Sequence, residues 1–232
     1  MLPPLIIAHR GASAVAPENT IAAFEAAITA GADGIEFDVR LSRDNLPVII
    51  HDDTLYRTHG IRRRVADMTL NELIQVGVPS LAQLFDLFRS NELLLCLEMK
   101  CEPGQQATMA EACARSIDEY QLRNRMIVEC FDLSALKILN EIDPALKTAA
   151  LFQSPASPFM IDRAIGSGAS VLALHYRCVN ARMIQQARSA GLKIVVWTVD
   201  DPTWVERARS NDIEALITND PAALLAARDT SV

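Results

Sequence analysis

Titratable and charged side chains recur where apolar, strand-like runs of this sequence end. Three carboxylates, two imidazoles and two cations hold these positions: Glu36, Asp38, Glu98, His9, His51, Arg10 and Lys100. Such groups are costly at the end of a core strand unless they are paired, hydrogen-bonded or bound to a metal. Their repetition is typical of a polar site at one end of a parallel barrel, and it indicates an enzyme that performs metal-assisted chemistry on a phosphate.

The three carboxylates are the strongest candidates for metal ligands. Glu36 and Asp38 lie two positions apart on one predicted strand, so their side chains point to the same face. Glu98 ends the next predicted barrel strand. Three converging carboxylates repel one another unless a cation neutralises them, and oxygen ligands suit Mg²⁺ or Ca²⁺. The alternative is that these acids only form ion pairs with Arg10 and Lys100.

The two histidines and two cations suit proton transfer and phosphate binding. His9 and His51 can divide general-acid and general-base work near neutral pH, whereas a lone histidine is more often a hydrogen-bonded core residue. Arg10 can hold phosphate oxygens with its guanidinium fork, and Lys100 can do so as a point charge. Charge balance of the acids is the alternative role of both cations.

Apolar runs alternate with helical patterns from one end of the chain to the other. Eight runs read as parallel strands: Leu5–Ala8, Gly34–Asp38, Leu93–Glu98, Met126–Cys130, Thr148–Phe152, Val171–His175, Ile194–Val199 and Glu214–Thr218. Eight strand–helix units predict an α/β fold, a (β/α)₈ TIM barrel, as a single domain over residues 1–232. An open doubly wound sheet is the alternative, and it would place its site at one crevice.

A short hairpin interrupts this alternation after the second strand. Too few residues separate Val39 from Val48 for a helical crossover, so the chain is expected to turn at Ser42–Asn45 and return antiparallel. This turn predicts that His51 comes back beside Glu36. The polar segment 54–69 is expected to form an irregular loop over the barrel mouth. Two asparagines are expected to cap helices, Asn19 the first and Asn219 the last.

Composition limits the classes of partner. The chain has 232 residues and a net charge of −7, which argues against a nucleic-acid binder and against an electrostatic membrane anchor. No uncharged apolar run approaches the length of a membrane helix, so stable membrane association is not expected. No signal peptide is read at the amino terminus, and the five cysteines are odd in number and lack a C-x-x-C motif. These features predict a cytoplasmic protein with free thiols, and they leave open whether it forms a homo-oligomer.

An ordered set of motifs over nearly the whole chain resembles the glycerophosphodiester phosphodiesterase family. The motifs are H-R-G-A-S-A-V-A-P-E-N-T, G-A-D-G-I-E-F-D-V-R-L-S-R-D, V-I-I-H-D and L-E-M-K, followed by V-V-W-T-V-D-D-P and L-I-T-N-D-P. The resemblance implies a barrel in which Glu36, Asp38 and Glu98 hold one divalent cation, Mg²⁺ or Ca²⁺. It also implies that His9 and His51 are the acid/base pair, and that Arg10 and Lys100 contact the phosphate of a small glycerophosphodiester.

Three further residues are candidates for the substrate site. Glu18 of the P-E-N-T motif is expected to orient groups at the mouth, and its alternative is a helix amino-terminal acid favoured by the dipole. Trp197 and Phe131 end or follow barrel strands and could wall the pocket, or simply pack. The segment after the H-D motif is shorter than in many family members and ends V-P-S-L, which leaves the head-group preference open. A lysophospholipid-cleaving phosphodiesterase and a non-catalytic binding barrel are the alternative functions.

Overall fold

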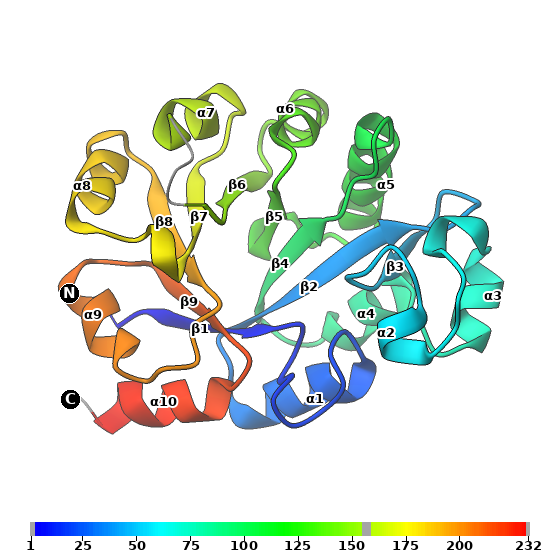
Figure 1. Cartoon of the computed structure of the whole chain (residues 1–232), viewed down its shortest axis with the longest axis horizontal. Coiled ribbons are helices and arrows are strands. Elements are labelled where there is room, and N and C mark those ends of the chain that lie inside the picture. The colour runs from blue at the N-terminus through cyan, green and yellow to red at the C-terminus, as the bar shows by residue number, and fades with distance from the viewer. Residues whose placement is uncertain (1–2, 155–158, 231–232) are drawn as a thin grey trace.

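Eight parallel strands close into a barrel in the computed structural model, which describes residues 3–154 and 159–230 (Figure 1). The strands follow chain order around the ring, and β1 closes it by pairing with both β2 and β9. They are β1 (Leu5–His9), β2 (Gly34–Leu41), β4 (Leu94–Met99), β5 (Met126–Cys130), β6 (Lys147–Phe152), β7 (Val171–His175), β8 (Lys193–Trp197) and β9 (Ala215–Thr218). The predicted (β/α)₈ barrel is confirmed, and the open sheet is excluded.

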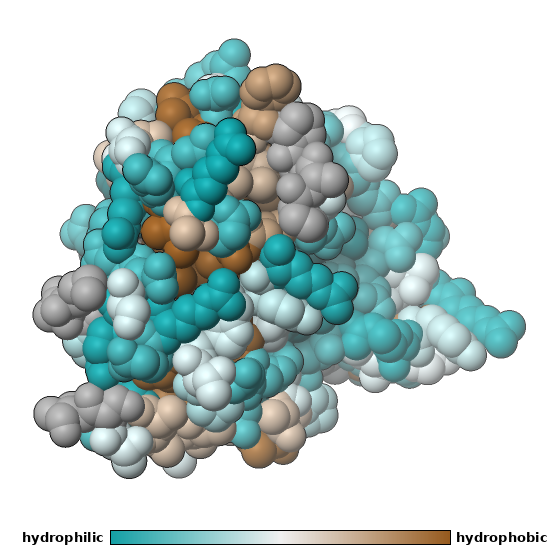
Figure 2. All heavy atoms as spheres, turned by 60° about the vertical axis from the view of Figure 1, so that its left-hand side comes forward, coloured by the Kyte–Doolittle hydropathy of each residue, from teal (hydrophilic) through white to brown (hydrophobic). Residues whose placement is uncertain are grey.

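Helices surround this barrel and cover its outer face (Figure 1). The main ones are α1 (Ile21–Ala30), α4 (Leu81–Phe88), α5 (Gln106–Glu119), α6 (Leu133–Ile142), α7 (Met160–Gly166), α8 (Ala181–Ser189), α9 (Trp204–Ser210) and α10 (Pro221–Thr230). The core lies between helices and strands, where Phe24 makes edge-to-face contacts with Phe37 and Phe88. On the side that carries α8 and α9 the surface is mostly hydrophilic, with small apolar patches (Figure 2).

The cap of the first helix differs from the prediction. Thr20, not Asn19, is the N-cap of α1, and its hydroxyl accepts a hydrogen bond from the amide of Ala23. Asn19 has a left-handed backbone with φ of 57°, which turns its side chain toward Asp38 instead. None of the helices in the described residues has the length and apolar character needed to cross a bilayer.

The predicted hairpin is present, and the segment after it is more ordered than expected. Strand β3 (Pro47–Ile49) pairs antiparallel with β2, with Val39 opposite Ile49. The following chain contains α2 (Tyr56–His59), a 3₁₀ turn at Val65–Asp67 and α3 (Leu70–Gln75), and it lies to one side of the barrel (Figure 1). Residues 48–78 share a small core of their own that includes Leu55, Val65 and Leu73. The prediction of an irregular loop was wrong here because widely spaced apolar residues close this core.

Candidate active site

Strand register brings the acidic residues to neighbouring positions at the carboxyl ends of the strands. His9 of β1 is opposite Glu36 of β2, and Asp38 is opposite Glu98 of β4. Glu98 is in turn opposite Glu129 of β5. Because parallel strands twist in one sense and keep this register, side chains far apart in the chain converge on one end of the barrel.

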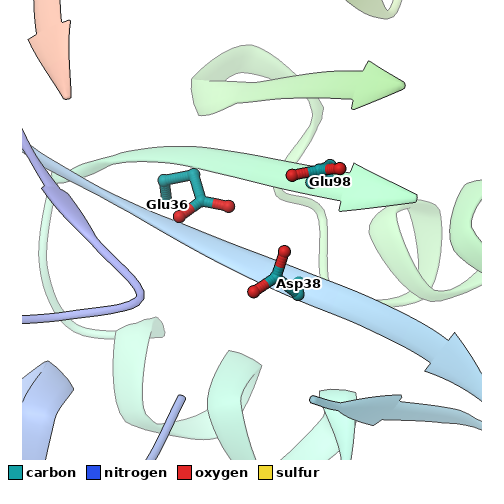
Figure 3. Close-up of side chains that lie close together, drawn as sticks. All are labelled: Glu36, Asp38 and Glu98. Carbon is teal, nitrogen blue, oxygen red and sulfur yellow. The ribbon is translucent and has the colours of Figure 1, made fainter. Parts of the chain in front are cut away.

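Glu36, Asp38 and Glu98 form a compact, buried acidic cluster. Glu36 and Asp38 project from β2 and Glu98 projects from β4, with the three carboxylates close together (Figure 3). One oxygen from each lies within 4.8 Å of the others. Their exposed fractions are 3%, 0% and 8%, so water screens their repulsion poorly. Such a donor set can hold a hard divalent cation.

Two cations pair with part of this cluster. Lys100 Nζ lies 2.5 Å from Glu98 Oε1 and 3.1 Å from Asp38 Oδ1. Arg10 Nε lies 3.0 Å from Asp38 Oδ2, and the Arg10 amide donates to Glu36 Oε2 at 3.0 Å. Ion pairing therefore accounts for Asp38 and Glu98, but Glu36 Oε1 is buried with no hydrogen-bond partner among the described residues. That bare oxygen fits a metal ligand better than a member of a salt-bridge network.

Burial and neighbouring charges set the protonation of these acids in opposite directions. Burial, together with the charges of Asp38 and Glu98, raises the pKa of Glu36 well above its ordinary value. Burial likewise raises the pKa of Glu98 to about 7. Burial also acts to raise the pKa of Asp38, but Lys100 and Arg10 outweigh it and lower that pKa. Asp38 is thus the anion of the cluster even without a bound cation.

Both histidines are held by a group on their Nδ1 atom. His9 Nδ1 lies 2.7 Å from Asn219 Oδ1, and the Asn219 amide is oriented because its Nδ2 donates to Asp200 at 2.8 Å. His51 Nδ1 donates to Asp52 Oδ1 at 2.7 Å. With Nδ1 protonated in both rings, each Nε2 is left to accept a proton. Burial lowers the pKa of His9 to about 4 and also lowers the pKa of His51, so both rings are neutral near pH 7.

Glu36 lies 3.9 Å from His9 Nε2 and His51 pairs with Asp52, so the predicted contact between His51 and Glu36 is not among the hydrogen bonds and ion pairs of the described residues. The hairpin places both residues in the lining of one cavity of about 90 Å³. The backbone links His51 more directly to Asp38, because the amide of Ile50 donates to the Asp38 carbonyl at 3.0 Å. The same cavity is lined by His9, Arg10, Glu98, Lys100, Phe131 and Trp197.

Glu18 and Asp38 do not line this cavity, but both form ion pairs with Arg10, which does. Glu18 accepts from Arg10 at 2.9 Å and from Arg57 at 2.6 Å. Arg57 also holds Asp52, the carboxylate that orients His51. A chain of ion pairs therefore connects Arg10 on the first loop to His51 on the hairpin. This arrangement agrees with an orienting role for Glu18 at the mouth, which stays a prediction.

Two aromatic rings form one wall of the cavity. Phe131 and Trp197 meet edge to face with centroids 5.7 Å apart, and Lys100 Nζ lies 5.9 Å from the centroid of Phe131. The indole Nε1 of Trp197 is buried without a hydrogen-bond partner in the described part of the chain. An unpaired buried donor beside a small polar cavity is available to a ligand oxygen.

Three residues of the site were missed by reading the sequence. Asn19 donates to Asp38 at 2.7 Å, and Asn219 holds His9, although both were expected to cap helices. Asp220, and not Asn219, accepts from the amide of Ala223 at the start of α10. Glu129 is a further buried acid, which lines the cavity with Glu36 and Glu98, and burial raises its pKa to about 8. Its place in the run M-I-V-E-C, at a strand end, was the signal that could have found it.

Comparison with known proteins gives one consistent family. The model of the Glycerophosphoryl diester phosphodiesterase family matches residues 9–223. A glycerophosphodiester phosphodiesterase of Caldanaerobacter subterraneus subsp. tengcongensis is 33% identical, over 95% of this chain and 96% of its own. Among solved structures, a Thermotoga maritima glycerophosphodiester phosphodiesterase has a TM-score of 0.82 at 28% identity, covering 98% of this chain and 100% of its own. An Oleispira antarctica phosphodiesterase, in complex with its product sn-glycerol-3-phosphate, has a TM-score of 0.90 at 24% identity, with 98% and 97% covered.

Proposed function

This chain belongs to the glycerophosphoryl diester phosphodiesterase family and is an enzyme, and we propose that it hydrolyses glycerophosphodiesters to sn-glycerol 3-phosphate and a small alcohol. The alcohol released is choline, ethanolamine or glycerol in this proposal. The observation that carries the proposal is the buried acidic cluster, in which Glu36 Oε1 has no hydrogen-bond partner among the described residues. Two cations and two neutral imidazoles lie in the cavity beside it. The product bound to the Oleispira phosphodiesterase supports the same chemistry. The whole chain is proposed to act as one domain.

Glu36, Asp38 and Glu98 are proposed to hold one divalent cation, Mg²⁺ or Ca²⁺. The fit rests on their three buried carboxylates and on the unpartnered Glu36 Oε1. When bound, such a cation polarises a phosphate oxygen and lowers the pKa of a hydroxyl group near it. The cations Arg10 and Lys100 pair with Asp38 and Glu98, so they leave Glu36 Oε1 available to a metal.

Arg10, Lys100 and Trp197 are proposed to position the phosphodiester. Arg10 and Lys100 line the cavity and already face the acidic cluster, so they can bridge between it and phosphate oxygens. The free indole N–H of Trp197 offers a further donor. Phe131 closes the wall against which the glycerol or the head group packs. Glu18 keeps Arg10 in place through their 2.9 Å ion pair.

His9 and His51 are proposed to transfer protons. Each presents an unprotonated Nε2, because Asn219 and Asp52 bind the Nδ1 side of the rings. One ring removes the proton of the attacking hydroxyl, which belongs either to water or to the glycerol 2-hydroxyl, and the other protonates the departing alcohol. Two neutral imidazoles do not assign these two roles, because the ring that acts as acid must first acquire a proton.

A coupled assay for sn-glycerol 3-phosphate tests this function. Purified protein is given glycerophosphocholine, glycerophosphoethanolamine and glycerophosphoglycerol, with Mg²⁺ or Ca²⁺ or with EDTA. We expect product from at least one substrate with metal and none with EDTA, and restored turnover after metal is added back. Absence of product from every glycerophosphodiester, with metal supplied, rules the proposal out.

The same assay separates the deacylated substrates from a lysophospholipid. Most of the residues that line the cavity are charged or polar, which favours a deacylated diester over a substrate that carries an acyl chain. Glycerophosphocholine is therefore expected to be cleaved faster than lysophosphatidylcholine at equal concentration. Faster cleavage of the lysolipid would assign the chain to the alternative function, a lysophospholipid phosphodiesterase.

A further inference from the structure

The interior of the barrel is underfilled at the end opposite the acidic cluster. Inward positions of (β/α)₈ barrels are normally filled by layers of bulky branched residues. In this chain the inward-facing residues that line this end include three small ones, Cys96, Ala149 and Ala215, and each belongs to a different strand. The space left along the barrel axis is a cavity of about 380 Å³, roughly four times the volume of the cavity at the candidate active site.

This axial cavity has apolar walls and opens where the strands begin. Ile7, Ile127 and Val195 line its sides. Its rim is formed by residues at or next to the first positions of strands, among them Leu5, Leu94, Lys147, Val171, Lys193 and Glu214. At its inner end the cavity reaches Glu129, which also lines the active-site cavity. The two cavities therefore lie on one axis, on opposite sides of that carboxyl group.

The rim carries an excess positive charge. Lys147 and Lys193 are both exposed there, and Lys193 forms an ion pair with Glu214. Lys147 forms no ion pair with any of the described residues, so its charge remains available. A cationic rim above an apolar cavity fits an amphipathic anion, with its charged head at the rim and its apolar tail inside the cavity.

The size of the cavity limits the tail. A cavity of about 150 Å³ lined by aliphatic residues holds one benzene molecule, so about 380 Å³ accommodates an unbranched chain of about eight to twelve carbons. We propose that the axial cavity binds the anion of a medium-chain fatty acid, with its carboxylate at Lys147 and its alkyl tail along Ile7, Ile127 and Val195. This site is separate from the phosphodiesterase site, and the proposal stands whether or not the proposed reaction is confirmed.

Calorimetric titration of the full chain with a homologous series tests the site. Hexanoate, octanoate and decanoate are expected to bind one to one, with affinity that rises about threefold to fourfold for each methylene group added. Decylammonium, of equal length and opposite charge, is expected to bind at least tenfold more weakly than decanoate. Absence of saturable decanoate binding, or equal binding of decanoate and decylammonium, overturns the proposal.

Cavity-filling variants locate the ligand. Ala149→Leu places its added atoms in the axial cavity, whereas Ala150→Leu on the same strand points into the packed layer between barrel and helices. Ala149→Leu is expected to keep the melting temperature and to lose decanoate affinity at least tenfold. Ala150→Leu is expected to lower the melting temperature, because that layer has no free volume. Unchanged decanoate binding to folded Ala149→Leu refutes the location.

Three further variants complete the test. If Ala149→Leu does not fold, Val195→Phe fills the cavity from another strand and is expected to give the same loss of decanoate affinity. Lys147→Met removes the free cation at the rim and is expected to weaken decanoate binding by about threefold to tenfold. Lys137→Met, on helix α6 away from the cavity, is the matched control and is expected to bind decanoate like the wild type. Equal affinities for decanoate in the two lysine variants contradict the assignment of the head group.

Discussion

Asn219 fixes which nitrogen of His9 can accept a proton. Its Oδ1 accepts from His9 and from Ser13, and its Nδ2 donates to Asp200, so the amide cannot turn without breaking these contacts. Asn219→Ala is expected to lower kcat by about 10- to 100-fold with little change in KM, because the ring loses its orientation. Asn180→Ala, which removes an ordinary helix cap, should lower only the melting temperature. A kcat for Asn219→Ala equal to that of Asn180→Ala would show that Asn219 only supports the fold.

The two cavity histidines are expected to contribute to the rate separately. His9→Ala and His51→Ala should each lower kcat by about 10²- to 10⁴-fold, the usual contribution of a general acid or base. His175→Ala, at the end of β7 among aromatic rings and outside the cavity lining, is the matched control and should retain most of the turnover. If His9→Ala binds substrate and turns it over at the wild-type rate, the chain is a binding barrel with a different catalytic group.

The sequence predicted the acidic and basic residues because the end of an apolar strand is a recognisable place for a charge. The structure brings Glu36, Asp38 and Glu98 together as that reasoning expected. Asn19 and Asn219 were misread because an asparagine before a helix is usually a cap. Their side chains turn inward for reasons that depend on partners distant in the chain, Asp38 for the first and His9 for the second.

The loop between β1 and α1 depends on one glycine. Gly11 has a φ of +81°, and a Cβ built on it would lie 2.6 Å from the backbone carbon of Ala23. Gly11→Ala is expected to displace the loop that carries Arg10, lowering turnover by about 100-fold or more, since a misplacement of about 1 Å has that effect. Gly31→Ala has the same type of strain, with φ of +79°, but meets no atom within 4 Å.

Comparison of these two glycine variants isolates the contribution of the loop. Gly31→Ala should lower stability by about 1 kcal/mol, the cost of a left-handed alanine, and leave turnover unchanged. Thermal melting and the coupled assay are measured on both proteins. Equal turnover in the two variants would mean that the position of the loop does not limit the reaction.

Strands and helices followed from apolar periodicity, whereas the segment after the hairpin did not. The strands β5 and β7 have the predicted bounds, and the others differ by a few residues at one or both ends. Residues 48–78 form their small core from apolar residues at irregular spacing, for instance Val48, Leu55 and Val65. These residues follow neither a helical nor a strand period, so the polar residues between them led to the prediction of an irregular loop. Tertiary contacts, which the local pattern does not contain, decide this part of the fold.

The buried acids make the stability of the whole molecule depend on pH and on metal. Burial raises the pKa of Glu98 to about 7 and the pKa of Glu129 to about 8, above the ordinary glutamate value of 4.5. Between these values the folded protein holds protons that the unfolded chain has released. Stability of the metal-free protein should therefore fall as pH rises through this range. The lowered pKa of His9 makes stability rise with pH, but only between about pH 4 and pH 6.5.

Between pH 6.5 and 8 the buried acids change the stability of the protein without the opposing effect of His9. The melting temperature of metal-free protein should decrease across it, and Mg²⁺ or Ca²⁺ should raise the melting temperature more at pH 8 than at pH 6.5. Both effects are measured by thermal melting with EDTA and with added metal. A metal-free melting temperature that rises from pH 6.5 to 8 would contradict the charge arrangement described for the barrel.

The central claim is that Glu36, Asp38 and Glu98 are metal ligands and not only partners of Arg10 and Lys100. Calorimetric titration of Mg²⁺ and Ca²⁺ into wild type and Glu36→Gln, with a melting curve of each, tests it most directly. We expect one ion per wild-type chain, a large loss of metal affinity in Glu36→Gln, and a fold that survives because one of three repelling charges is removed. Intact metal affinity together with a large loss of stability would instead show that Glu36 belongs to a structural ion-pair network.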